Sequence, residues 1–201
     1  MADLLMARES LPKTKEYTYA DIEQWPADER WELINGTPYN MSPPPARMHQ
    51  KISGVLFRKI GNYLEGKTCE VYSAPFGVWL VEKEEDIPQA SNYVEPDIVV
   101  VCDQNKLTDK GCAGAPDLII EIVSPSTAAK DMCQKLNLYE ASGVKEYWVV
   151  HPADRVVMVF HLDGNKYGRP MTYSPEEPGA NTVRVGILPD LEINLGEVFA
   201  E

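Results

Sequence analysis

Two short, nearly unbroken apolar runs, 98–102 and 118–123, constrain the fold of this chain more than any other feature. Each run follows a Pro-Asp pair, and its residues do not alternate between apolar and polar types as a half-exposed strand would. Strands of this kind are buried on both faces, as in the centre of an α/β sheet. We therefore predict that the two runs form the core of a sheet that other elements cover.

Helical patterns flank these strands. Apolar residues recur every three or four positions over 46–64, which predicts a long amphipathic helix. A second helix is expected after the second run, capped by Ser126 or Thr127 and ended by Gly143 in a left-handed conformation. Its predicted apolar stripe consists of Ala128, Met132, Leu136 and Tyr139.

Turn and cap signals define the remaining elements. Thr18 followed by Asp21 predicts a capping box and a short helix over 18–25. Asn35-Gly36 predicts a hairpin between 30–34 and 37–41, because both turn positions need positive φ. The other predicted strands are 71–81 (interrupted by Pro75 and Gly77 at an edge or bulge), 146–150, 155–161, 166–173 and 182–187, with a turn at Asp163-Gly164.

The chain has the size of one domain. It holds 201 residues, of which 44% are apolar, and no linker divides it. We expect a single domain over 17–201 and a poorly ordered N-terminal extension over 1–16. No apolar run is long enough to span a bilayer and the first fifteen residues lack a signal-peptide pattern, so we expect a cytoplasmic protein with no membrane partner.

The four cysteines, Cys69, Cys102, Cys112 and Cys133, are far apart and show no Cys-x-x-Cys pair. This spacing indicates neither a disulfide framework nor a structural zinc site. Free thiols in a reducing compartment are expected.

The formal net charge of -12 argues against a strong nucleic-acid binder, because such affinity comes largely from cationic side chains that displace phosphate counterions. Positive charge is nevertheless concentrated in one segment. Either this segment is the solvated face of an amphipathic helix or it contacts a phosphate backbone. Its members are Arg47, His49, Lys51, Arg58 and Lys59.

A carboxylate lies in the middle of the second apolar run. Side chains alternate along a strand, so Glu121 shares a face with Asp117, Ile119 and Val123. A buried carboxylate must lie at an open edge, pair with a cation or hold a metal. Asp97 heads the other run, and if the two strands pair there, both carboxylates could share a hard cation such as Mg²⁺. Each residue also has an ordinary explanation, a turn for Asp97 and an arginine partner for Glu121.

Lys135 lies at the border of the helix face that packs on the sheet. From there it could reach the carboxylates, or it could bury its stem and keep its amine in solvent.

Taken together, these motifs resemble the Uma family, a bacterial branch of the PD-(D/E)XK nuclease superfamily that is described as putative restriction endonucleases. The resemblance extends from about Tyr17 to the end of the chain. The motifs that carry it are Glu32-Leu-Ile-Asn-Gly, Val94-Glu-Pro-Asp97, the Pro116 to Thr127 stretch with its Glu-x-x-Ser-Pro-Ser-Thr segment, Asp131 with Lys135-Leu, and Gly143-Val-Lys-Glu-Tyr-Trp148.

The resemblance implies an α/β (α+β) fold of the restriction-endonuclease type, with a mixed sheet flanked by helices and additional strands at the C-terminus. It implies that Asp97, Glu121 and the carbonyl of Ile122 hold Mg²⁺, or alternatively Mn²⁺. Val123 stands where the superfamily has the lysine of Glu-x-Lys, and Lys135 is the matching replacement in the Uma branch. Glu32 is a candidate third carboxylate, and His49 is expected nearby.

The expected activity is metal-dependent hydrolysis of nucleic-acid phosphodiester bonds, with Lys135 assisting the attacking water. The nucleic acid, for which DNA is favoured while RNA stays open, would be bound weakly. No basic arm, zinc ribbon or helix-turn-helix is present, so target recognition would require a homo-oligomer or a partner subunit.

Three alternatives remain. The acidic charge favours a catalytically inactive scaffold that keeps the nuclease fold and acts through protein partners. Paired carboxylates also serve glycosidases, but the four tryptophans fall at positions typical of core packing rather than of sugar platforms. The third alternative is a zinc hydrolase, but His49, His151 and His161 lack the helical i, i+4 spacing that many such enzymes use.

Overall fold

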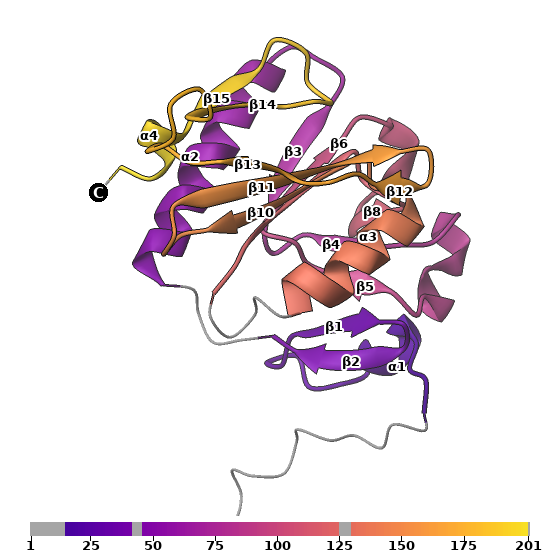
Figure 1. Cartoon of the computed structure of the whole chain (residues 1–201). Coiled ribbons are helices and arrows are strands. Elements are labelled where there is room, and N and C mark those ends of the chain that lie inside the picture. Colours follow the sequence, from indigo (N-terminus) through magenta and orange to yellow (C-terminus); the bar gives the residue numbers. More distant parts are fainter. Residues whose placement is uncertain (1–14, 42–45, 125–129, 201) are drawn as a thin grey trace, which may run out of the picture.

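A mixed seven-stranded sheet forms the centre of the molecule in the computed structural model, which describes residues 15–41, 46–124 and 130–200 (Figure 1). Its strand order is β12-β11-β10-β9-β6-β3, with β13 added on β11. Only the β9–β10 pair of this sheet is parallel. The strands are β3 (Glu70–Ser73), β6 (Ile98–Val101), β9 (Leu118–Ile122), β10 (Glu146–His151), β11 (Val156–Asp163), β12 (Lys166–Tyr167) and β13 (Met171–Tyr173).

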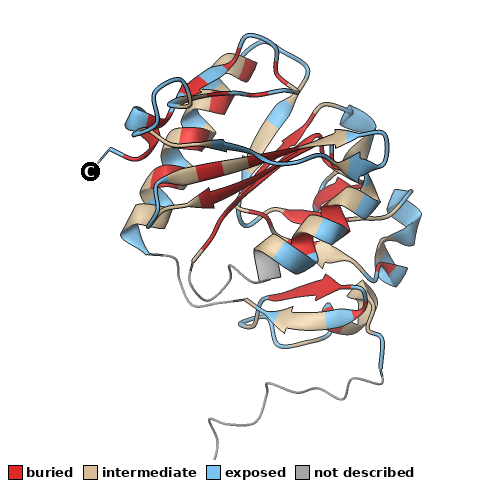
Figure 2. Cartoon of the chain, viewed as in Figure 1, coloured by how far each residue is buried: buried red, intermediate tan, exposed pale blue. Residues whose placement is uncertain are grey.

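The two apolar runs are the central strands β6 and β9, as predicted, and they pair antiparallel (Figure 2). Successive residues of β9 enter two different cores. Leu118, Ile120 and Ile122 belong to one hydrophobic cluster, whereas Ile119 and, directly after the strand, Val123 belong to another. Each face of the sheet is therefore covered by its own layer, which accounts for the unbroken apolar sequence.

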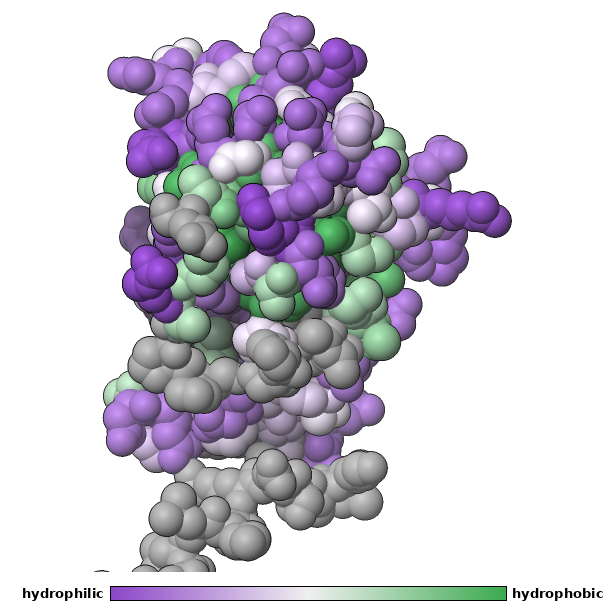
Figure 3. Space-filling view, turned by 60° about the vertical axis from the view of Figure 1, so that its left-hand side comes forward, coloured by the Kyte–Doolittle hydropathy of each residue, from purple (hydrophilic) through white to green (hydrophobic). Residues whose placement is uncertain are grey.

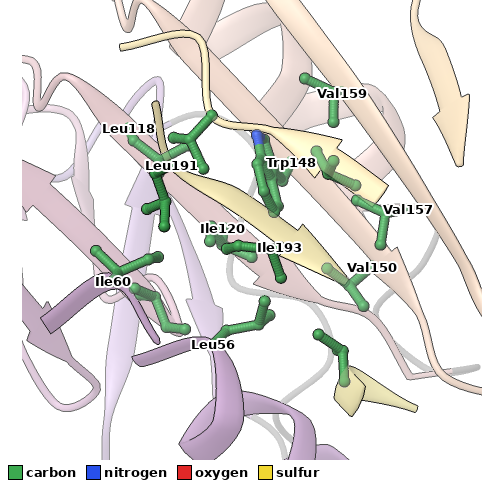
Figure 4. Packing of buried hydrophobic residues seen from close by; sticks show 14 of the residues in the cluster. Leu56, Ile60, Leu118, Ile120, Trp148, Val150, Val157, Val159, Leu191 and Ile193 are labelled. Carbon is green, nitrogen blue, oxygen red and sulfur yellow. The ribbon is translucent and has the colours of Figure 1, made fainter. Parts of the chain in front are cut away.

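The first layer consists of α2 (Arg47–Leu64) and the C-terminal elements. Leu56 and Ile60 of α2 pack with Ile120 of β9 and Ile193 of β15 in the cluster drawn in Figure 4. The apolar spacing over 46–64 thus predicted this helix correctly. The C-terminal part comprises the hairpin of β14 (Thr182–Arg184) and β15 (Glu192–Asn194), followed by α4 (Leu195–Val198).

The second layer combines α3 (Leu136–Ser142) with a six-stranded sheet, which the sequence did not predict as a separate sheet. The Asn35-Gly36 hairpin lies at one edge of that sheet, and both turn residues have positive φ, 49° and 69°. In strand order the sheet consists of β2 (Thr37–Asn40), β1 (Trp31–Ile34), β5 (Tyr93–Val94), β4 (Gly77–Trp79), β8 (Gly111–Ala113) and β7 (Leu107–Thr108).

Several predicted elements have different bounds. The segment 71–81 is not one strand, because the chain turns at Pro75 and leaves β3 at the edge of the central sheet and β4 in the other sheet. The segment 166–173 is divided at Gly168, and the hairpin turn before it is Gly164-Asn165, one residue later than predicted. The remaining short helices are α1 (Tyr19–Ile22), which is shorter than predicted, η1 (Glu84–Gln89) and η2 (Gln104–Lys106).

The described part of the helix after β9 opens with a π-helical turn, Lys130–Lys135, and this helix ends before Gly143, whose φ is 84° as the predicted stop requires. The candidate caps Ser126 and Thr127 lie outside the described residues. In the described ranges, no helix is long and apolar enough to cross a bilayer.

The expectation of free thiols was wrong for two cysteines, since Cys69 and Cys102 form a disulfide. Glu70 pairs with Val101 between antiparallel β3 and β6, and extending this register places the two cysteines opposite each other. A pairing that depends on strand register is not visible in cysteine spacing. Cys112 and Cys133 are free, and burial raises the pKa of the Cys112 thiol to about 12.

Candidate active site

Glu121 lies near the end of β9 and faces the second layer, on the side predicted from strand alternation. It is only 5% exposed. Its Oε1 accepts hydrogen bonds from the Lys135 ammonium at 2.7 Å and from the Tyr139 hydroxyl at 2.8 Å. A buried carboxylate in the middle of a strand needs an explanation, and here the carboxylate pairs with a cation.

Lys135 is the cation. It ends the π-helical turn that precedes α3, and its side chain is 4% exposed, so the amine does not extend into solvent. The ammonium contacts Glu121 Oε1 at 2.7 Å and Glu32 Oε1 at 2.8 Å. Two charge-assisted contacts compensate for the loss of hydration that burial of an ammonium group entails.

Glu32 is the residue that the six-stranded sheet contributes to this site. It lies in β1, where its neighbours Trp31 and Leu33 pack toward α1 and Glu32 points the other way. The side chain is 1% exposed, and Oε1 also accepts a hydrogen bond from the Glu95 backbone N–H at 3.2 Å. One ammonium therefore joins carboxylates from two sheets.

Asp97 precedes β6 directly and is the more accessible carboxylate, with 22% of its side chain exposed. Ile98 pairs with Ile120, so the same antiparallel register places Asp97 opposite Glu121. Asp97 Oδ2 accepts a hydrogen bond from the Ile122 N–H at 2.7 Å and lies 3.2 Å from His49 Nε2 at the start of α2. The expected neighbourhood of His49 is confirmed, and the backbone of Ile122 adjoins Asp97.

Tyr139 is the residue of this cluster whose polar role the sequence did not indicate. The helical stripe marked it as a core residue, and its ring is fully buried and packs edge-on against Tyr147. Its hydroxyl nevertheless bonds to Glu121. Burial, and secondarily the Glu121 charge, raises the pKa of Tyr139 well above its ordinary value, so the hydroxyl remains a donor. The available signal was its position four residues after Lys135, on the same helix face.

The charges of the cluster suit a divalent cation. Asp97, Glu121 and Glu32 carry three formal negative charges against the one positive charge of Lys135. In the described ranges, no group of three or more His, Cys, Asp or Glu side chains is arranged to hold a metal ion. Mg²⁺ does not require such a group, since it keeps several waters and commonly binds to proteins through one or two carboxylates. Asp97 and Glu121 are oxygen donors of that type.

Two curated relatives come from Synechocystis and are both called uncharacterized proteins. One, slr1290, is 28% identical over 134 residues, covering 66% of this chain and 66% of its own length. The other, sll1609, is 26% identical over 127 residues, covering 62% of this chain and 67% of its own length. The match therefore spans about two thirds of each relative.

A solved structure has a similar fold. The crystal structure of a putative nuclease from Anabaena variabilis matches with a TM-score of 0.71 at 17% identity, covering 91% of this chain and 97% of that one. The sequence profile of the Uma2 family, described as "Putative restriction endonuclease", matches residues 19–196. The expected family is thus confirmed over most of the chain, and the chain belongs to the Uma2 family.

Proposed function

We propose that this protein is a Mg²⁺-dependent endonuclease that hydrolyses phosphodiester bonds of nucleic acid at the cluster around Glu121. The observation that carries the proposal is that the Lys135 ammonium joins Glu121 and Glu32 from two sheets, while the register of β6 and β9, extended by one residue, places Asp97 opposite Glu121. Buried charge of this kind is costly, and a functional site accounts for its presence in an otherwise apolar core.

Asp97 and Glu121 would hold the metal, with the Ile122 carbonyl as a third oxygen donor. When bound, Mg²⁺ supplies charge for a phosphate oxygen and lowers the pKa of a coordinated water. Lys135 would orient the attacking water through its ammonium. Glu32 would hold that ammonium in place, because its Oε1 contacts Nζ at 2.8 Å.

A second candidate is a catalytically inactive scaffold. The net charge of -12 favours it, as does the closed ion cluster that Lys135 forms with its two carboxylates inside the protein. The two functions differ in one respect that can be measured, because a scaffold gains nothing from a divalent-metal site.

The deciding experiment compares cleavage of supercoiled plasmid, linear duplex, single-stranded DNA and RNA in Mg²⁺ or Mn²⁺. Glu121→Gln is expected to abolish cleavage. Glu146→Gln is the control, because Glu146 is also a buried carboxylate, in which Oε1 accepts a hydrogen bond from Trp148 and Oε2 accepts one from the Ile187 N–H. It should keep the activity. Equal activity in wild type and Glu121→Gln would reject this site.

A metal-binding measurement distinguishes the metal-ligand role proposed for Asp97 from the water-orienting role proposed for Lys135. Mg²⁺ or Mn²⁺ should raise the melting temperature of the wild type but not that of Asp97→Asn. Lys135→Arg should keep the metal response and lose about 100-fold in cleavage rate, because a displaced cation no longer orients the attacking water. Loss of the metal response in Lys135→Arg would contradict the assigned roles.

A further inference from the structure

The helix α2 differs in charge from the rest of the chain. Its 18 residues include Arg47, Lys51, Arg58 and Lys59 and no Asp or Glu, in a protein whose net charge is -12. The lack of acidic residues extends over the whole helix. The side of the molecule where α2 and α4 lie comes forward in Figure 3, where hydrophilic residues prevail toward the top and apolar residues show between them in the middle.

The structure divides the basic residues of α2 into two groups. Lys59 forms an ion pair with Glu197 at 2.6 Å. Arg47, Lys51 and Arg58 form no ion pair with any carboxylate in the part of the chain that the structure describes. These three residues therefore carry positive charge that the described fold does not use.

Arg47, Lys51 and Arg58 follow one stripe of the helix, at spacings of four and seven residues. At 100° per residue they fall within about 40° of one another, and the rise of the helix spreads them over about 16 Å. Arg47 and Arg58 are exposed and Lys51 is half-buried. The buried residues Ile52, Leu56, Ile60 and Leu64 lie on the opposite side of α2.

Gly54 lies within this stripe, between Lys51 and Arg58. A Cβ atom built at Gly54 would meet nothing within 4 Å, so the helix surface here is open to a partner. Glycine is otherwise costly inside a helix, by about 1 kcal/mol relative to alanine.

We propose that this stripe, Arg47, Lys51, Gly54 and Arg58, binds the phosphate backbone of duplex DNA; the inference rests on the proposed nuclease function. Duplex DNA presents one negative charge per 1.7 Å of its axis, so a straight stripe of about 16 Å faces a dense row of phosphates. The stripe begins at the end of α2 that carries His49, whose Nε2 lies 3.2 Å from Asp97 Oδ2. At about 100° per residue, however, His49 lies on the side of α2 opposite to the stripe, so the stripe faces away from Asp97 and shares with the candidate site only this end of the helix.

Gly54 allows a test with little risk to the fold. Gly54→Glu and Gly54→Gln have the same shape and differ by one charge, and each has room in the helix. Binding of a fluorescein-labelled 30-base-pair DNA duplex is measured by anisotropy without divalent metal. The dissociation constant of Gly54→Glu should exceed that of Gly54→Gln by about fivefold, from one added like charge near the phosphates.

A triple variant, Arg47→Ala with Lys51→Ala and Arg58→Ala, should weaken duplex binding by at least tenfold. The slope of log affinity against log salt should fall by about 2 to 3, because each phosphate that a cation neutralises contributes about 0.9 to it. The control triple, Lys110→Ala with Arg169→Ala and Arg184→Ala, removes the same net charge from exposed positions elsewhere and should bind like the wild type.

Equal affinity of Gly54→Glu and Gly54→Gln, or equal weakening by both triples, overturns the proposal. Tighter binding of single-stranded DNA or of RNA than of the duplex also overturns it. Binding through the stripe without any cleavage would reject the nuclease function alone. Cleavage that the stripe triple leaves unchanged would reject the stripe alone.

Discussion

The sequence predicted part of the environment of one buried carboxylate, Glu121. Strand alternation predicted its face, and the cost of burying a charge predicted that a partner must exist. The partner is the Lys135 ammonium at 2.7 Å, with Tyr139 as a second donor at 2.8 Å. Neither donor could be assigned from the strand alone, because each comes from a helix that packs over it.

Tyr139→Phe tests the second donor. The substitution removes one hydrogen bond to a buried carboxylate and keeps the ring, so we expect a loss of about 1–3 kcal/mol in the free energy of unfolding. Urea denaturation at pH 7 measures it, at a pH where the raised pKa keeps the Tyr139 hydroxyl protonated.

Tyr167→Phe is the control for this measurement, since its hydroxyl donates to the neutral carbonyl of Val144 at 2.9 Å and is only partly buried. Tyr167→Phe should lower the free energy of unfolding by less than Tyr139→Phe does. An equal or larger loss for Tyr167→Phe would mean that the Glu121 contact has no special weight.

At the scale of elements, turn and cap signals predicted local structure, whereas the shortest strands could not be predicted. The capping box predicted for α1 is present, with Asp21 Oδ2 accepting from the Thr18 N–H at 2.9 Å. The Asn35-Gly36 hairpin formed as predicted and aims Glu32 at the site. The short strands β5, β7 and β8 were not predicted, because two or three residues show no periodicity.

The close approach of β4 and β8 at Gly111 predicts that a larger residue there destabilises the protein. Its φ is 155°, and an added Cβ would lie 2.2 Å from the Gly77 carbonyl oxygen of the paired strand. Because backbone on both sides must move, Gly111→Ala should destabilise the protein by about 3 kcal/mol or more. Thermal or urea unfolding measures the change.

Gly61→Ala in α2 serves as the reference substitution. Its Cβ would meet only Val71 Cγ1, at an ordinary 3.6 Å, so better helix propensity should stabilise the protein by up to about 1 kcal/mol. A Gly111→Ala variant as stable as Gly61→Ala would contradict the close approach of β4 and β8.

For the whole molecule, the central sheet separates two cores and joins the chain across them. The disulfide Cys69–Cys102 closes a loop with a sequence separation of 33 that contains β3, β4, β5, β6 and Asp97. It therefore links the edge of the central sheet to the strand that follows the candidate metal ligand.

Cys69→Ser combined with Cys102→Ser should lower the free energy of unfolding by about 3–4 kcal/mol, from the loop-closure entropy of a loop this long. Reduction of the wild type by dithiothreitol should shift the urea midpoint in the same direction. The double variant itself should not respond to dithiothreitol, because Cys112 and Cys133 are free. A wild type that is indifferent to the reductant would contradict this contribution.

The sequence by itself determined the local features: the buried strands β6 and β9, the helix α2, the hairpin turn, the face of Glu121 and the family. These follow from periodicity and from the conformational needs of single residues, which a linear sequence records directly. The tertiary structure decided which distant residues meet. The second sheet, the cysteine pair and the contact of Lys135 with both Glu32 and Glu121 depend on strand register and layer packing, and these are set by the combined burial of all elements.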